Sequence, residues 1–303
     1  MNQSTAHSTE EIAWINPIGG YGDMLMVSGV LKQVIERDRL RCFNLVRRSM
    51  YRTIFRDHPA IRAIGYPPQG AHIIGTDYWR YGLNANENRP YQILARIFGL
   101  PTPAEEILYL PGVDEMDPLL EMAIPWREKN VVIAPGADSP RKMMSLDQWQ
   151  SLTQQFKEDG FFVIQTGRIR ERHIEDSYSL LGLTSPQQLI ALIKAADIVI
   201  TLDNFAMHAA YLAGTPAVVL WGPTAPEIYG YPGQYHLRAP LKCEQIDRCI
   251  GPETPDHYGT PCPLESHHCM DLIPLEDIRK AVRKMLGEVD SRLKELKDQA
   301  LRE

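Results

Sequence analysis

Apolar residues recur along the chain in short continuous runs that alternate with longer stretches of helical spacing. In the first half, buried strands are predicted over residues 12–16 and 41–46, with a helix over about 23–37 between them. Residues 58–64 lead into a third strand, and another helix is predicted over 91–98. This alternation of strands and helices is typical of an α/β fold.

The second half restarts the same alternation. Strands are predicted over 130–134, 161–165, 197–202 and 217–221, and helices over 145–159, 185–194 and 206–213. A charged amphipathic helix is expected from about residue 275. Helices of this length between strands imply parallel sheets with right-handed crossovers, in which ligands bind at the carboxyl ends of the strands.

The two halves predict two domains, which a chain of 303 residues is long enough to form. We expect an N-terminal domain over 1–125, a C-terminal domain over 126–274 and a final helix over 275–303. The stretch 101–125 is rich in proline and acidic residues, and we interpret it as edge structure and linker. Two such domains that face each other would form a cleft.

Composition narrows the classes of function. The formal net charge of −6 argues against broad electrostatic binding of nucleic acid. No apolar run approaches the ~18 residues that span a bilayer, and the N-terminal sequence lacks the basic and apolar regions of a signal peptide. We therefore expect a cytoplasmic protein with reduced cysteines and at most peripheral contact with the inner face of a membrane.

The segment Asp203 to His208 carries the strongest chemical signal, because it joins a predicted strand to a helix of small residues. The N–H groups and dipole of a helix start attract anions, and a carboxylate beside them can bind hydroxyl groups. That combination indicates a sugar nucleotide. His208 lies one helical turn beyond Asn204, and it is either part of this site or simply a packed histidine.

Three other loops follow predicted strands and could complete a site. The turn Gly19-Gly20-Tyr21-Gly22-Asp23 is neither a dinucleotide fingerprint nor a Walker loop, and Asp23 is either a helix N-cap or a general base. Arg141 and Lys142 form either an exposed basic loop or a diphosphate site. Glu171 is either a surface residue or an acceptor for ribose hydroxyls.

Four cysteines cluster in one proline-rich segment, at positions 243, 249, 262 and 269. Cys243, Cys249, Cys262 and Cys269 could bind a structural zinc or iron ion, although their spacings are wider than those of common zinc modules. Reduced cysteines that pack a loop are the alternative interpretation.

These segments together resemble glycosyltransferase family 9, the group of the bacterial heptosyltransferases, over most of residues 12–285. The most specific stretch runs from Asp203 to Gly222 and beyond, with the pattern Asp-x-x-x-x-His-Ala-Ala, Ala-Gly-Thr-Pro and Trp-Gly-Pro-Thr. Family members usually have Ser or Thr and then Gly after the acid, where this chain has Asn204 and Phe205.

The resemblance implies a GT-B fold: two Rossmann-like doubly wound domains that face each other across a cleft, with the C-terminal helix crossing back. It implies inverting transfer from a nucleoside-diphosphate sugar, commonly ADP-heptose, without a catalytic metal. By position, the resemblance implies that Asp23 would be the general base, that Lys142 would hold the diphosphate, and that Glu171 and Asp203 would bind the ribose and the sugar hydroxyls. The N–H groups of Asn204 and Phe205 would face the diphosphate. The candidate donor site as a whole comprises Gly136, Arg141, Lys142, Thr166, Gly167, Glu171, Asp203, Asn204, Phe205 and His208.

The working hypothesis is therefore an inverting glycosyltransferase that moves a heptose or hexose to an acceptor hydroxyl, as in lipopolysaccharide or other surface-glycan assembly. The acceptor would be a glycan, a lipid-linked molecule or a protein. Two alternative functions would also require binding of the same donor. The chain could be a sugar-nucleotide epimerase or hydrolase of GT-B fold, or a non-catalytic sugar-nucleotide-binding protein. The epimerase or hydrolase would release an epimer or free sugar without acceptor, whereas the binding protein would show no turnover.

Overall fold

The computed structural model describes residues 12–47, 51–101, 106–113, 118–240, 243, 249–250, 262 and 269–300. The chain divides into two compact units. Unit 1 comprises Met1–Tyr78 and Tyr91–Pro111, and unit 2 comprises Trp79–Pro90 and Gly112–Glu303. The short excursion Trp79–Pro90 groups with unit 2, where the Arg89 guanidinium donates to the carbonyl oxygens of Ile228 and Gly230. The predicted domain ranges of 1–125, 126–274 and 275–303 stay predictions.

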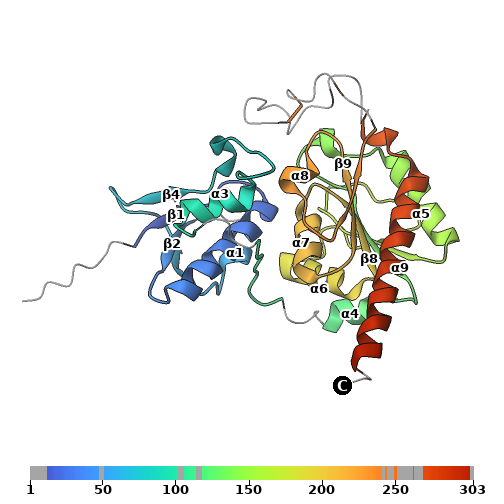
Figure 1. Ribbon diagram of the computed structural model, residues 1–303, viewed down its shortest axis with the longest axis horizontal. Coiled ribbons are helices and arrows are strands. Elements are labelled where there is room, and N and C mark those ends of the chain that lie inside the picture. Colours follow the sequence, from blue (N-terminus) through green and yellow to red (C-terminus); the bar gives the residue numbers. More distant parts are fainter. Residues whose placement is uncertain are drawn as a thin grey trace, which may run out of the picture. The chain divides into compact units, whose positions relative to one another are not determined.

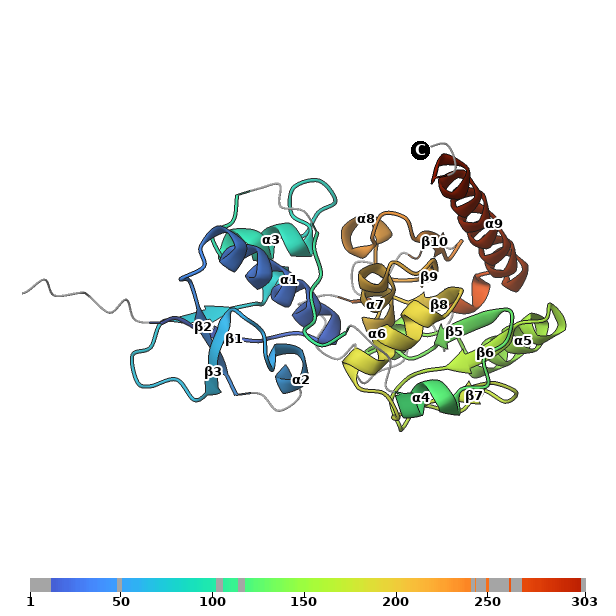
Figure 2. The same ribbon diagram turned by 90° about the horizontal axis from the view of Figure 1, so that it is seen from below.

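Unit 1 is built on a four-stranded parallel sheet with the strand order β3-β2-β1-β4. The strands are β1 (Trp14–Asn16), β2 (Phe43–Val46), β3 (Ile61–Gly65) and β4 (Ile73–Gly75). The helical elements are α1 (Tyr21–Arg37), α2 (Arg52–Phe55), α3 (Pro90–Ile97) and the 3-10 turn Tyr78–Tyr81 that leads out of the unit. Helices α1 and α3 lie side by side (Figure 2), and the Gln33 Nε2 donates to the Tyr91 hydroxyl at 3.0 Å between them.

Unit 2 is built on a six-stranded parallel sheet with the order β10-β9-β8-β5-β6-β7. The strands are β5 (Asn130–Ala134), β6 (Phe162–Gln165), β7 (Tyr178–Ser179), β8 (Ile198–Leu202), β9 (Ala217–Trp221) and β10 (Tyr235–Arg238). The central strands β5, β8 and β9 are buried along their whole length. A sheet covered on both faces requires such continuous apolar runs.

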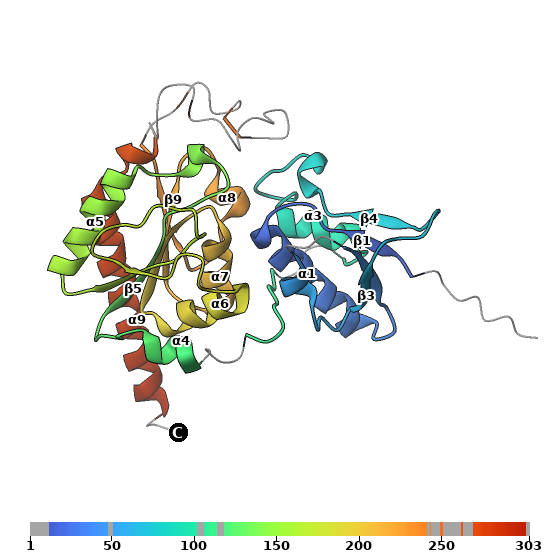
Figure 3. The same ribbon diagram turned by 180° about the vertical axis from the view of Figure 1, so that it is seen from behind.

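Helices cover both faces of the unit 2 sheet. The α-helices are α4 (Pro118–Ala123), α5 (Leu146–Glu158), α6 (Pro186–Ala195), α7 (Phe205–Ala213), α8 (Pro226–Tyr229) and α9 (Leu275–Ala300), with short 3-10 turns at Pro140–Lys142 and Met270–Leu272. Helices α5 and α9 lie on one face, and α6 and α7 lie on the other (Figures 1 and 3). Trp149, Phe156, Ile278 and Val282 join the strands in one buried core.

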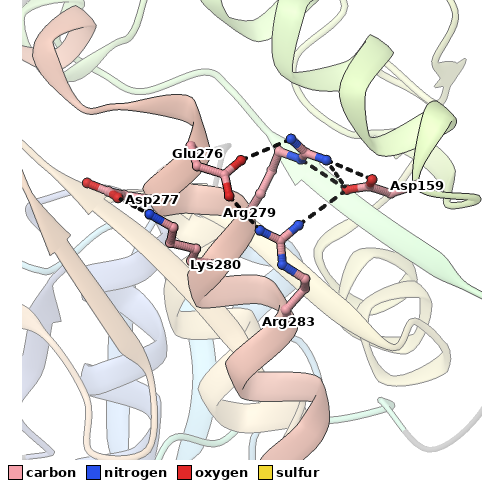
Figure 4. Close-up of polar contacts among 6 residues, drawn as sticks. All are labelled: Asp159, Glu276, Asp277, Arg279, Lys280 and Arg283. Carbon is pink, nitrogen blue, oxygen red and sulfur yellow. Dashed lines mark hydrogen bonds and ion pairs between the residues drawn. The ribbon is translucent and has the colours of Figure 1, made fainter.

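Helix α9 is fixed to the end of α5 by an ion-pair cluster (Figure 4). Arg279 donates to both carboxylate oxygens of Asp159, which follows α5, at 2.7–3.0 Å. Arg283 contributes to the same cluster through Glu276 at 2.7 Å. The predicted return of this helix to the N-terminal domain stays a prediction.

The strand orders identify where ligands should bind. In chain order, unit 2 follows the pattern 3-2-1-4-5-6 of doubly wound sheets, and unit 1 follows the 3-2-1-4 part of it. In such sheets the direction of winding reverses between the first and fourth strands, and a crevice opens at their carboxyl ends. The loops after β5 and β8 meet there in unit 2, and the loops after β1 and β4 meet there in unit 1.

Candidate functional site

An ion pair marks the reversal point of unit 2. Lys142, in the loop after β5, donates from its Nζ to the Asp203 Oδ2 at 2.7 Å, and Asp203 comes directly after β8. The two side chains are only 20% and 11% exposed. Ser139 caps the 3-10 turn that carries Lys142, since its hydroxyl accepts from the Arg141 N–H. The strand order therefore brings together two residues that lie 61 positions apart in the chain.

The electrostatics of this pair follow from its burial. Burial by itself would raise the pKa of Asp203, but the Lys142 charge and hydrogen bond outweigh it, and the pKa lies below its ordinary value. Thr224 and His208 act in the same direction. The Thr224 hydroxyl is buried beside this carboxylate. The Asp203 carboxylate is therefore ionised at neutral pH.

His208 is uncharged at neutral pH. Burial lowers its pKa to about 4, although the neighbouring Asp203 charge acts to raise it. The His208 Nδ1 lies 2.7 Å from the Tyr231 hydroxyl, and Tyr231 stacks on Tyr211 with ring centroids 4.1 Å apart. The histidine is thus both packed and adjacent to the ion pair, so the two interpretations of it are compatible.

Asn204 joins the loops on either side of the reversal point. Its Oδ1 accepts from the backbone N–H of Ala206 at 2.9 Å, as a helix N-cap does, and also from the Thr201 hydroxyl at 2.7 Å. Its Nδ2 donates to the carbonyl oxygens of Ala134 and Gly136 at 3.1 and 2.7 Å. An asparagine side chain can make all of these bonds, whereas a serine has no amide to reach β5.

Phe205 begins α7 in ordinary helical backbone. The described residues with positive φ other than glycine are Asp57 and Asp176, so no left-handed conformation is required at Phe205. The replacement of the family's usual glycine by phenylalanine therefore causes no backbone strain at this position.

Glu171 is enclosed by two glycines at the neighbouring loops. A Cβ added at Gly136 or Gly167 would lie 2.2–2.3 Å from the Glu171 carboxylate, so both positions require glycine while this carboxylate is in place. The Oε1 accepts from the Arg168 N–H at 3.0 Å, whereas the buried Oε2 has no hydrogen-bond partner among the described residues. Burial raises the pKa of Glu171. The buried Thr166 hydroxyl is likewise unpartnered within the described part of the chain.

Arg141 points toward the cysteine segment. Its side chain is buried, and its NH1 donates to the Cys249 carbonyl oxygen at 2.6 Å. The two adjacent basic residues thus have different surroundings: Lys142 donates to the Asp203 carboxylate, whereas Arg141 donates to the Cys249 carbonyl oxygen. The sequence alone could not assign these different partners.

Asp23 lies at the reversal point of unit 1. It is the third residue of α1, and its Oδ2 accepts from the Gly20 N–H at 2.6 Å. Its Oδ1 accepts from the Tyr78 hydroxyl, in the loop after β4, at 2.5 Å. Gly19 has φ +126°, and a Cβ there would lie 2.5 Å from the Asp23 carboxylate. Asp23 therefore caps the helix start from inside the first turn, as in a capping box, rather than as the N-cap residue itself.

Three residues at these sites were not among the sequence candidates: Thr224, Tyr231 and Tyr78. Thr224 ends the Trp-Gly-Pro-Thr pattern and Tyr78 opens the aromatic segment Tyr78-Trp-Arg-Tyr81, so both carried a sequence signal. No sequence signal identified Tyr231, because a single tyrosine in a predicted turn belongs to no recognisable motif.

The four clustered cysteines are all free thiols in the structure. Burial raises the pKa of Cys269 to about 11, and the charges of Cys249, Cys262 and Cys243 act in the same direction. Within the part of the chain that the structure describes, no three His, Cys, Asp or Glu side chains are already arranged to hold a metal ion. In the same part, no helix is both long and apolar enough to cross a membrane.

The fold is shared with several solved glycosyltransferases. The E. coli ADP-heptose lipopolysaccharide heptosyltransferase II is 16% identical with a TM-score of 0.64, and the match covers 92% of this chain and all of that one. A family 9 glycosyltransferase from Veillonella parvula is 13% identical with a TM-score of 0.66, over 92% and 98% of the chains. The iron-containing dodecameric glycosyltransferase TibC from enterotoxigenic E. coli is 16% identical with a TM-score of 0.70, over 92% and 77%.

These likenesses confirm the predicted α/β architecture with GT-B topology. No curated protein matches the chain at a significant level. The sequence pattern of glycosyltransferase family 9 (heptosyltransferase) matches residues 86–245, which is more than half of the chain and includes Lys142, Glu171 and Asp203. The chain therefore belongs to glycosyltransferase family 9, the heptosyltransferase family.

Proposed function

We propose that this glycosyltransferase moves a heptose from ADP-heptose to an acceptor hydroxyl with inversion at the anomeric carbon. The buried Lys142–Asp203 pair carries the proposal, since it sets a cation for phosphate beside a carboxylate for sugar hydroxyls. Two E. coli relatives of the same fold support ADP-heptose as donor: TibC has a solved complex with ADP-D-β-D-heptose, and the heptosyltransferase WaaC has one with ADP.

Each donor group has a residue of matching chemistry. The Lys142 ammonium would transfer from Asp203 to the diphosphate, which leaves the Asp203 carboxylate free to accept from sugar hydroxyls. The unpartnered Oε2 of Glu171 would accept from ribose hydroxyls, beside Gly136, Thr166 and Gly167. The N–H groups of Asn204 and Phe205 would face the diphosphate at the start of α7. His208, uncharged, would border the sugar without repelling Lys142.

Asp23 would remove the proton from the acceptor hydroxyl as that oxygen attacks the anomeric carbon. The Gly20 N–H and the Tyr78 hydroxyl each donate to one of its two carboxylate oxygens and so orient the group that would act as the base. The diphosphate leaves as the new glycosidic bond forms, and Lys142 with the helix start stabilises its developing charge. We propose that this charge stabilisation makes a catalytic metal unnecessary.

A screen of nucleotides tests the donor. Thermal shift and calorimetry with ADP, UDP and GDP and their sugars should show preferential binding of ADP and ADP-heptose by at least about 10-fold. A clear preference for UDP or GDP would contradict the proposed donor, and absence of all nucleotide binding would contradict the proposed site.

Transfer itself is tested with labelled ADP-heptose and an extract of the source cells, which supplies the acceptor. We expect label to enter a glycan, lipid-linked or protein fraction. Asp23→Asn should reduce incorporation by about 10²–10⁴-fold while ADP binding stays intact. Near-wild-type incorporation by that variant would contradict the base assignment, and release of free heptose or an epimer without acceptor would favour the hydrolase or epimerase.

We also propose that Cys243, Cys249, Cys262 and Cys269 hold a structural zinc or iron ion. The four cysteines lie within one segment of the sequence, four soft ligands suit either metal, and TibC is an iron-containing relative of the same fold. Elemental analysis should find about one ion per chain, lost in Cys262→Ser. Protein purified without any bound metal would contradict this assignment.

The proposed location is the cytoplasm, with at most peripheral membrane contact. Reduced thiols are stable in that compartment. Fractionation should place the protein in the soluble fraction or in the part that salt releases from membranes. Recovery only after detergent treatment would contradict the proposal.

A further inference from the structure

The cysteine segment contacts the donor loops at more than one point. Arg141 immediately precedes Lys142, and its buried guanidinium donates to the Cys249 carbonyl oxygen at 2.6 Å. Three residues after Lys142, the Ser145 N–H donates to the Asp271 Oδ1 at 2.7 Å, and Asp271 lies two residues beyond the last cysteine. The turn that carries Lys142 is therefore bonded to the cysteine segment on one side and to Asp271, just beyond that segment, on the other.

The loop after β9 rests on the same segment. A Cβ added at Gly222 would lie 2.5 Å from the Met270 sulfur and 3.0 Å from the Cys269 sulfur, so the backbone packs directly against them. Met270 is fully buried in the core of unit 2. Two residues after Gly222 comes Thr224, which lies beside Asp203. Both loops that flank Asp203 are thus supported by residues from or next to the cysteine segment.

From these contacts we propose that Arg141 is a positioning residue, which sets the donor affinity by coupling the cysteine segment to Lys142. A buried guanidinium bonded to a backbone carbonyl holds the two loops together more strongly than a neutral bond would. The inference rests on the proposed donor site, because it requires that Lys142 binds the diphosphate. It differs from the sequence-based expectation that Arg141 itself contacts the diphosphate.

A double-mutant cycle separates the two roles of Arg141. ADP affinity is measured by calorimetry for wild type, Arg141→Gln, Lys142→Gln and the double variant. If Arg141 acts through Lys142, Arg141→Gln should weaken ADP binding by roughly 10-fold alone but by less than about 2-fold when Lys142 is already replaced. If Arg141 binds the diphosphate directly, the fold-losses of ADP affinity in the two single variants should multiply in the double variant. That result would overturn the inference.

Asp271→Ala provides a second route to the same test, at a residue remote from the ligand. It removes the bond to the Ser145 N–H without changing any proposed donor contact. We expect it to weaken ADP binding several-fold, again only while Lys142 is present. An unchanged ADP affinity in folded Asp271→Ala protein would contradict the proposed support of the Lys142 turn.

Thiol labelling reports on the cysteine segment independently of the donor. In the purified full-length protein, Arg141→Gln should speed labelling by a thiol reagent at least about 5-fold, since the bond from Arg141 to the Cys249 carbonyl oxygen is gone. Lys142→Gln and the exposed control Arg238→Gln should label at the wild-type rate, and the control should bind ADP normally. Unchanged labelling in Arg141→Gln would overturn the coupling to the cysteines. If Lys142→Gln alone left ADP binding unchanged, the proposed donor site would fail as well.

Discussion

At the scale of single residues, the proposed site contains side chains that stabilise the fold and that would also contact the ligand. Asn204 caps α7 and also bonds to two carbonyl oxygens of the β5 loop. Lys142 neutralises the buried Asp203 carboxylate, and in the proposed donor complex it would bind a phosphate instead. The sequence identified these residues as candidates from their positions after predicted strands. Their partners depend on the strand order, which the sequence pattern did not contain.

Asn204 should therefore be essential to stability as well as to the site. Asn204→Ala removes the cap and the bonds to Ala134 and Gly136, and we expect a loss of about 2–4 kcal/mol in the free energy of unfolding. Asn204→Ser restores the cap alone and should lose about 1–2 kcal/mol. Urea unfolding measures both. Equal stability of the two variants, or of Asn204→Ala and wild type, would show that the bonds contribute little.

His58 should make unit 1 sensitive to acid. Burial lowers its pKa to about 4. In the neutral ring, Nε2 donates to the Ser28 carbonyl oxygen and Nδ1 accepts from the Ala60 N–H, and protonation removes that acceptor. The unfolded chain, with an ordinary pKa of 6.5, binds the proton more readily. Stability should thus fall by up to about 3 kcal/mol as the pH drops from 6.5 to 4.

Unfolding monitored between pH 7.5 and 4.5 checks this, with His58→Gln as the comparison. The variant should be less stable at pH 7.5 but should lose less stability on acidification than wild type. The exposed His173→Gln is the control and should keep the wild-type slope. An identical pH dependence of His58→Gln and wild type would rule out His58 as the titrating group.

At the scale of elements, the continuous apolar runs predicted the central strands well. Strands β5, β8 and β9 match the predicted segments because a strand buried on both faces needs such a run. The short strands β4, β7 and β10 were not predicted, since two to four partly exposed residues give no clear periodicity. Helix α1 begins at Tyr21 rather than near Asp23 because Gly20 provides the N-cap.

Helix α1 contains a glycine whose role is set by another element. A Cβ at Gly29 would lie 1.7 Å from the Ile107 carbonyl oxygen, so the chain at residue 107 crosses the helix at this point. Gly29→Ala should therefore destabilise unit 1 by about 1–3 kcal/mol despite the better helix propensity of alanine.

The same substitution in α9 provides the control. Nothing lies within 4 Å of a Cβ added at Gly287, so Gly287→Ala should stabilise the protein by up to about 1 kcal/mol. Thermal unfolding of the two variants should move in opposite directions. A stabilising effect of Gly29→Ala would contradict the close crossing of residue 107.

At the scale of the whole molecule, two sheets of related topology each place polar residues at the point where their winding reverses. Unit 2 brings Lys142 and Asp203 together there, and unit 1 brings Asp23 and Tyr78 together. The family resemblance anticipated the fold class, whereas the roles that it implies for the candidate residues stay predictions. It did not anticipate the different surroundings of Arg141 and Lys142, which depend on the cysteine segment.

The proposed donor site is tested most directly by the affinities of Asp203→Asn for ADP-heptose and for ADP, measured side by side by calorimetry. We expect ADP to bind this variant at least as tightly as it binds wild type, because a negative charge beside the diphosphate is gone. The additional affinity for the sugar should fall by roughly 10-fold, since the amide cannot accept from hydroxyls as a carboxylate does. An unchanged ratio of the two affinities would contradict Asp203 as the sugar ligand and the donor site built around it.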